Sequence, residues 1–155
     1  MRVAIVGALL MLGFAAGCGE DAGGMAAGRH FGYVQAVDVS STPATLEFDA
    51  ADFLTGEEAS DAAEENGAIA EGEGVPNDYY IRNDDETTDT LDVAADVRVT
   101  RFECVEGCVE DVDADFAAFA SGFDVATDDY RGAESQYWLT LEDGEVVAID
   151  ELYLP

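Results

Sequence analysis

The chain has 155 residues and a formal net charge of −29, because 35 aspartates and glutamates oppose six arginines and no lysine. A single-sign field of this size repels nucleic acid and anionic lipid, and it strains the compact state through self-repulsion. Nucleic-acid binding is therefore excluded. Without an N-terminal leader, the remaining length suits one domain with a hydrophobic core but not two.

The N-terminus has the order of a secretory signal peptide: Arg2, an apolar run from Val3 to Ala16, and small residues before Cys18. The run is too short for a transmembrane helix, which needs about 20 residues. Ala15-Ala16-Gly17-Cys18 resembles the lipobox of bacterial lipoproteins, and the resemblance implies that Cys18 is acylated and becomes the mature N-terminus. Lipoboxes usually carry leucine where this chain has Ala15, so ordinary signal cleavage is the alternative.

The segment after Cys18 is rich in glycine and short of large apolar residues, which is typical of a flexible tether. The predicted organisation is a signal peptide at 1–17, a lipidated cysteine and tether at 18–28, and a single acidic β-rich domain at 29–155. Two or more acyl chains hold a protein durably on a membrane. We therefore predict an extracytoplasmic protein anchored to the bacterial cell membrane, or a secreted one if Cys18 is not lipidated.

Lipidation of Cys18 would leave two cysteines, Cys104 and Cys108, separated by three residues that include Gly107. In an oxidising compartment this pair predicts a structural disulfide across a tight turn. A metal site is the second interpretation, but the C-x3-C spacing lacks a second His or Cys pair. Free or redox-active thiols are the third.

The acidity has three candidate explanations. Adaptation to high salt agrees with the absence of lysine, because concentrated ions screen charges within a few ångströms. Cation binding is suggested by the alternating carboxylates of 111–115, but an EF-hand loop would need glycine at Phe116 and glutamate at Gly122. A disordered acidic tail disagrees with the many aromatic and β-branched residues. The sequence predicts no metal ligand and no cofactor.

Strands are predicted wherever apolar residues alternate with polar ones. The first hairpin joins 30–39 to 44–49 and places Phe31, Tyr33, Val37 and Val39 on one face. Further strands are expected at 79–82 and 97–102. The last hairpin joins 136–141 to 145–152 through Asp143-Gly144, a strong turn signal.

Two helices interrupt these strands. The first begins with a capping box in which Thr55 caps and Glu58 reaches back, and it ends at Gly67 with a buried stripe of Ala59, Ala62 and Ala63. The second is predicted from Val112 to Ser121, where Val112, Phe116, Phe119 and Phe123 share a face. The fold class is therefore mainly β (α+β): a small antiparallel barrel or strongly bent sheet, with an OB-like barrel as one candidate, and two short helices.

Three segments of the domain look like those of an uncharacterised family of small secreted bacterial proteins: 52–59 (DFLTGEEA), 75–83 (VPNDYYIRN) and 137–140 (YWLT). The resemblance would cover most of residues 30–155. It implies one folded domain and supplies no catalytic residues.

Catalytic signatures are absent from the sequence: it has no nucleophile elbow, no S-x-x-K, no phosphate-binding loop, and one histidine, His30. Carboxylate pairs can hydrolyse glycosides, but among 35 acidic residues a pair chosen by eye carries little information. We therefore assign no catalytic residue, and a binding function is preferred to an enzymatic one.

The best indication of a ligand site is aromatic. Because neighbouring strand residues point to opposite faces, Tyr79 and Ile81 are expected in the core, leaving Tyr80 and Arg82 outside together with Trp138. Such a patch could stack on a sugar or grip a peptide, unless a helix or the loop 68–78 covers it. The resulting hypothesis is a membrane-anchored module that binds an extracytoplasmic partner or small ligand. A hydrolase with a carboxylate pair at a barrel mouth and a cation-binding envelope module are the alternatives.

Overall fold

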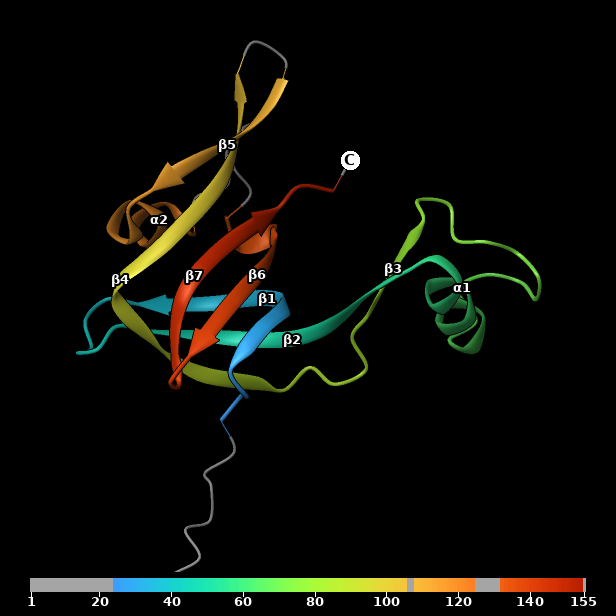
Figure 1. Cartoon of the computed structure of the whole chain (residues 1–155), viewed down its shortest axis with the longest axis horizontal. Helices are drawn as coiled ribbons and strands as arrows, with labels where there is room; N and C mark the ends of the chain where they lie inside the picture. Colours follow the sequence, from blue (N-terminus) through green and yellow to red (C-terminus); the bar gives the residue numbers. More distant parts are fainter. Residues whose placement is uncertain (1–23, 106–107, 125–131, 155) are drawn as a thin grey trace, which may run out of the picture.

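The computed structural model describes residues 24–105, 108–124 and 132–154, and of residues 104, 105, 108 and 109 the backbone alone. Within these ranges the protein is mainly β, as predicted, with seven strands and two α-helices (Figure 1). In chain order the elements are β1 (Gly28–Asp38), β2 (Thr45–Thr55), α1 (Gly56–Glu65), β3 (Tyr79–Arg82), β4 (Thr88–Val105), β5 (Cys108–Ala114), α2 (Phe116–Gly122), a 3-10 turn (Gly132–Glu134), β6 (Gln136–Glu142) and β7 (Glu145–Leu152).

Five of the strands close into a ring. β1 pairs with β2 and β6, β6 pairs with β7, and the two halves of the circuit meet where β4 pairs with both β7 and β2. Every pair is antiparallel except β4 with β7. In chain order the ring strands are β1, β2, β4, β6 and β7. The parallel pair, β4 and β7, therefore joins the third and the fifth ring strands, and α2 lies between the third and the fourth. This connectivity is that of a small OB-like barrel.

The hydrophobic core lies inside this ring and consists of side chains that alternate along the strands. Phe48, Tyr137, Leu139 and Ile149 are fully buried there. Each such side chain contributes about 1.5–3 kcal/mol through removal of apolar surface from water. Helix α2 adds two more aromatic rings to the core, Phe119 and Phe123.

Helix α2 is shorter than the sequence predicted. Val112 belongs to β5, where it pairs with Arg101 of β4, and the helix begins only after Asp115. Asp115 is the N-cap: its Oδ1 accepts a hydrogen bond of 2.7 Å from the backbone N–H of Ala118. The expected burial of Phe119 and Phe123 is nevertheless confirmed.

The chain also builds a lateral extension, residues 52–82, which projects from the barrel in Figure 1. Here β2 runs past the ring and pairs with β3, and α1 packs on these two strands. The predicted alanine stripe of α1 is buried. Thr55 is its N-cap residue, but the side-chain hydrogen bond expected from a capping box is not formed.

Two turns predicted from the sequence can be compared with the structure. Asp143 and Gly144 have φ values of 50° and 88°, the positive values that a tight β-hairpin turn requires, so the last hairpin is confirmed. Cys104 and Cys108 lie at the end of the β4–β5 hairpin, where Cys104 pairs with Val109 and Cys108 with Val105. Their side chains lie outside the described residues, and their disulfide stays a prediction.

The expected signal peptide, Cys18 and most of the tether also lie outside the described residues. In the part of the chain that the structure describes, neither helix has the length and apolar character needed to cross a membrane.

Candidate functional site

An aromatic cluster covers the outer face of the barrel where β1, β2, β3 and β6 lie side by side. It consists of Phe31, Phe53, Tyr79 and Trp138. Phe31 is directly opposite Trp138 in the β1–β6 ladder, so the two rings share a face and their centroids are 5.1 Å apart. Phe53 lies 5.1 Å from Phe31 and stacks on Tyr79 at 5.3 Å.

The outward direction of Phe31 corrects the predicted face of β1. Phe31, Tyr33 and Val37 have the same sequence parity, but a bulge between Val34 and Ala36 shifts the register by one residue. Phe31 and Tyr33 therefore lie outside, whereas Val34 and Val37 pack in the barrel core. Val39, the fourth residue of the predicted face, is 60% exposed beyond the end of β1.

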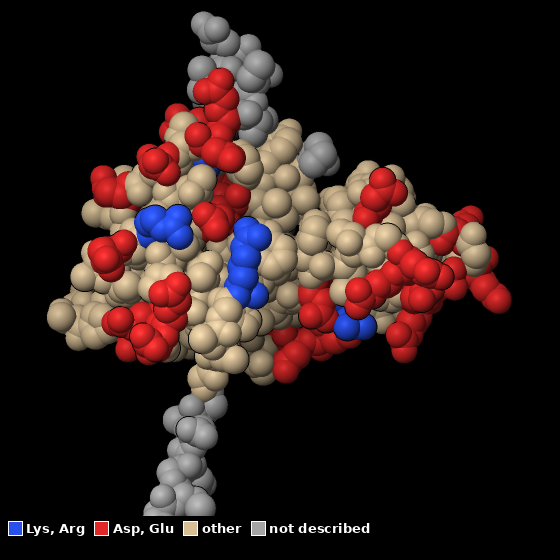
Figure 2. Space-filling view, viewed as in Figure 1, with Lys and Arg blue, Asp and Glu red and all other residues tan. Residues whose placement is uncertain are grey.

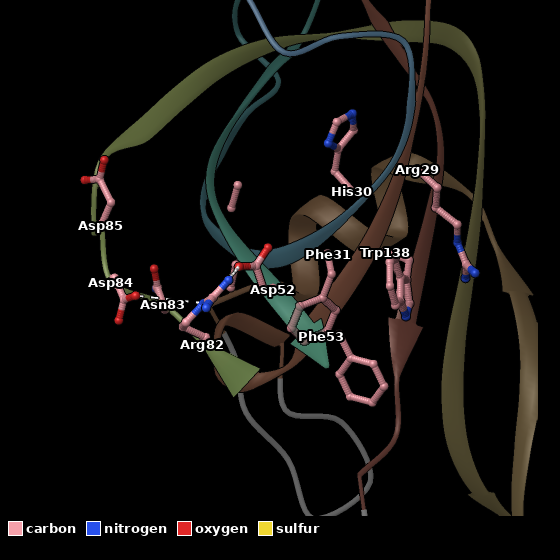
Figure 3. Close-up of a pocket in the computed structure, with 12 residues that line it drawn as sticks. Arg29, His30, Phe31, Asp52, Phe53, Arg82, Asn83, Asp84, Asp85 and Trp138 are labelled. Carbon is pink, nitrogen blue, oxygen red and sulfur yellow. Dashed lines mark hydrogen bonds and ion pairs between the residues drawn. The ribbon is translucent and has the colours of Figure 1, made fainter. Parts of the chain in front are cut away.

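Three of these rings, Phe31, Phe53 and Trp138, form the apolar side of a groove with a volume of about 440 Å³. Arg29, Phe31, Phe53 and Trp138 line one side, and the segment from Arg82 to Asp85 lines the other (Figure 3). The Arg29 guanidinium carbon lies 4.5 Å from the centre of the Trp138 ring, a cation–π arrangement. The groove thus presents flat aromatic faces opposite polar side chains.

An ion pair in which two guanidinium N–H groups share one carboxylate oxygen lies on the polar side. Arg82 donates from Nε and Nη2 to Asp52 Oδ2, at 3.1 and 2.8 Å, and Asp84 Oδ2 lies 3.9 Å from Arg82 Nε. Hydrogen bonding to Asp52 raises the pKa of Arg82 above its ordinary value, so the guanidinium stays charged at any physiological pH. Because Arg82 is about one third exposed, its remaining N–H groups can reach a ligand in the groove.

The three predicted ligand-binding residues are only partly brought together. Arg82 and Trp138 line the same groove, as expected. Tyr80 lies elsewhere: it packs with Leu54 beneath α1, and its hydroxyl is 3.4 Å from Asn66 Nδ2. Tyr79, which was expected in the core, takes part in the aromatic cluster instead.

The exchange of Tyr79 and Tyr80 has a simple cause. β3 does not belong to the barrel ring, and the face that carries Tyr80 is covered by α1. The acidic loop that could have covered Trp138 folds over α1 as well, since Val75 packs on the α1 cluster and the Gly72 N–H donates to Glu64 at 2.7 Å. The sequence signal for β3 was correct, but α1 covers Tyr80, whereas Arg82 on the same strand reaches the groove and all four β3 residues stay partly exposed.

Groups that could carry catalysis are engaged in structural contacts. His30 Nε2 donates to the Ala26 carbonyl oxygen at 2.8 Å. The buried Glu151 accepts from the Ser135 hydroxyl at 2.5 Å and from the Phe102 N–H at 3.0 Å, which uses both carboxylate oxygens. In the groove, Asp52 and Asp84 both face Arg82 instead of flanking a scissile bond. This arrangement suits binding better than hydrolysis.

No protein-family model, no curated protein and no solved structure matches the chain. The likeness to an uncharacterised family of small secreted bacterial proteins therefore stays a prediction.

Proposed function

We propose that this protein is a membrane-anchored extracytoplasmic lipoprotein whose barrel binds a short neutral saccharide in the groove between Trp138 and Arg82. The pairing of flat aromatic rings with charged hydrogen-bonding groups is the observation that carries the proposal. A sugar ring presents C–H groups on its faces and hydroxyl groups around its edge. Trp138 and Phe53 suit the faces, and Arg82, Asp52 and Asn83 suit the hydroxyls.

The fold and the charge support the same ligand class. OB-like barrels bind oligosaccharides and oligonucleotides. Acidic side chains, which lie on both the barrel and the lateral extension in Figure 2, give the protein a strong net negative charge that disfavours oligonucleotides. A fold by itself does not imply a function, so the groove residues must provide the test.

Trp138 is the only tryptophan of the chain and lies in the groove, so its fluorescence reports on binding there. We expect at least one of three neutral probes, maltohexaose, cellohexaose or chitohexaose, to change Trp138 emission saturably. Phe53→Ala should weaken that binding at least tenfold, because it removes a stacking face. Glu47→Gln, an exposed change on the same strand outside the groove, is the matched control. The absence of a saturable change with all three probes would contradict the saccharide proposal.

The proposed anchor has its own test. If Cys18 is acylated, the wild-type protein partitions into membranes and Cys18→Ser becomes soluble. Equal partitioning of both proteins would contradict the anchor and favour secretion after ordinary signal cleavage. The matched control is Ser40→Ala, an exposed change outside both the lipobox and the cysteine pair.

An extracytoplasmic location also leads us to propose the Cys104–Cys108 disulfide, since oxidising compartments preserve such bonds. In the β4–β5 hairpin Cys104 pairs with Val109 and Cys108 with Val105, so the two cysteines are one residue out of step and the bond requires a local change at the hairpin end. Mass spectrometry without reduction should find the peptides around Cys104 and Cys108 linked. Recovery of both as free thiols would contradict the bond.

A further inference from the structure

Two buried acceptor oxygens beside the groove have no hydrogen-bond donor. They are Oδ1 of Asp49 on β2 and Oδ1 of Asn83, which follows β3. Asp49 is only 5% exposed, and its other oxygen accepts from Asn83 Nδ2 at 3.0 Å. Buried polar atoms are nearly always paired, so two unpaired acceptors on two touching side chains call for a missing positive or proton-bearing group.

The surroundings of the pair supply more oxygen atoms and no positive charge. Asp49 and Asn83 line a hollow of about 520 Å³ on the outer face of the barrel, whose other lining residues are Tyr33, Gln35, Glu86 and Thr88. Each of these six side chains carries an oxygen, and none is a lysine, arginine or histidine.

We propose that Asp49 and Asn83 are ligands of a calcium ion, with Glu86 as a further ligand from the rim. Calcium takes six to eight oxygen ligands in flexible geometry and accepts carboxylates, amide carbonyls, hydroxyls and water. The described residues do not bring three acidic, histidine or cysteine side chains together for a metal. The site therefore combines one buried and one exposed carboxylate with neutral oxygens, a set that suits a hard cation and disfavours zinc or copper.

The position of the site gives the ion a structural consequence. Asp49 belongs to the barrel ring, whereas Asn83 directly follows Arg82 and lines the saccharide groove as well as this hollow. An ion held by both residues ties the connection from β3 to β4 to the barrel. It thereby fixes the polar wall of the groove. The calcium test needs no saccharide, so its outcome is independent of the proposed saccharide binding.

Calorimetric titration of CaCl2 into the protein in about 1 M NaCl tests the site, because salt at that concentration screens diffuse attraction to the acidic surface. We expect saturable binding of one calcium ion, weakened at least tenfold by Asp49→Asn. Glu47→Gln removes an exposed carboxylate two residues away on β2 and should bind as the wild type does. Terbium should bind in place of calcium and give luminescence sensitised by Tyr33, and Asp49→Asn should remove that signal.

The rival occupant of the hollow is a water molecule that donates to both oxygens. No saturable calcium heat with the wild type, or unchanged affinity in Asp49→Asn, would mean water alone and would overturn the proposal. If Asp49→Asn fails to fold by circular dichroism, Glu86→Gln decides, because Glu86 is exposed and dispensable for the core. A severalfold weaker calcium affinity in Glu86→Gln supports the site, and an unchanged affinity overturns it.

Discussion

The inside and the outside of this barrel both carry clustered aromatic rings, but the two clusters are packed differently. Inside, Phe48, Phe119 and Tyr137 are fully buried and contact neighbours on every side. Outside, Phe53 and Trp138 are only half-buried: both rings contact Phe31, Tyr79 stacks on Phe53, and the Arg29 guanidinium lies over Trp138. Core packing explains the first cluster completely. The partly exposed rings of the second cluster add less to folding, which is why we assign them to a ligand.

The largest expected effect on stability comes from a residue of the hydrophobic core. Phe48→Ala removes a fully buried ring from the centre of the core and should lower the free energy of unfolding by about 3–5 kcal/mol. Urea unfolding followed by circular dichroism measures the change. A smaller loss of unfolding free energy in Phe48→Ala than in Phe53→Ala would contradict the assignment of Phe48 to the core and of Phe53 to the outer cluster.

Salt should weaken the repulsion between the acidic groups and leave the packing of the hydrophobic core unchanged. Because the net charge of −29 repels itself, screening by NaCl should raise the midpoint of thermal unfolding by several degrees between low and molar salt. Differential scanning calorimetry over a salt series provides the measurement. A flat response would refute salt adaptation as the reason for the acidity.

Phe53→Ala should have a smaller effect on stability than Phe48→Ala, about 1 kcal/mol, because the Phe53 ring is half-buried. Its effect on saccharide binding should be the larger one. The same urea experiment compares the two variants directly. Loss of the fold in Phe53→Ala would show that the outer cluster is a structural element and weaken its assignment to a ligand.

The smallest effect concerns alkaline pH. Burial raises the folded-state pKa of Tyr33 above its ordinary value of 10.0, so the neutral hydroxyl is favoured in the folded protein. The corresponding stability is fully present below pH 10.0 and is lost as the pH rises through the folded-state pKa. Tyr33→Phe should therefore lose less stability than the wild type on going from neutral pH to above pH 10.0. Tyr153→Phe, at a tyrosine that is about half exposed, is the matched control; an equal alkaline loss in wild type and Tyr33→Phe would contradict the effect.

Local patterns predicted much of the fold. Alternation located the strands of both hairpins, Asp143-Gly144 located a tight turn, and the alanine spacing of α1 identified its buried stripe. The length of β4 was underestimated, because aspartates and threonines dilute the alternation in its first half. β5 was assigned in part to a helix, since Val112 happens to be four residues from Phe116 and fits a helical period as well.

The candidate site was half predicted. Arg82 and Trp138 were identified because strand alternation placed them away from the core, whereas Tyr80 was included and Tyr79 omitted because the covering helix could not be foreseen. The importance of Phe31 and Phe53 depends on the bulge in β1 and on pairing between strands. No local pattern reports either.

The sequence alone determined the strong acidity and the predominance of strands, and it predicted two helices and a small barrel or bent sheet, with an OB-like barrel as one candidate. Only the tertiary structure decided which face of β1 is inside, because a single-residue bulge at Val34–Ala36 reverses the alternation there. It also decided that Asp49 meets Asn83, 34 residues later in the chain, with two oxygens unpaired. Alternation specifies two faces of a strand, but burial depends on partners that are distant in sequence.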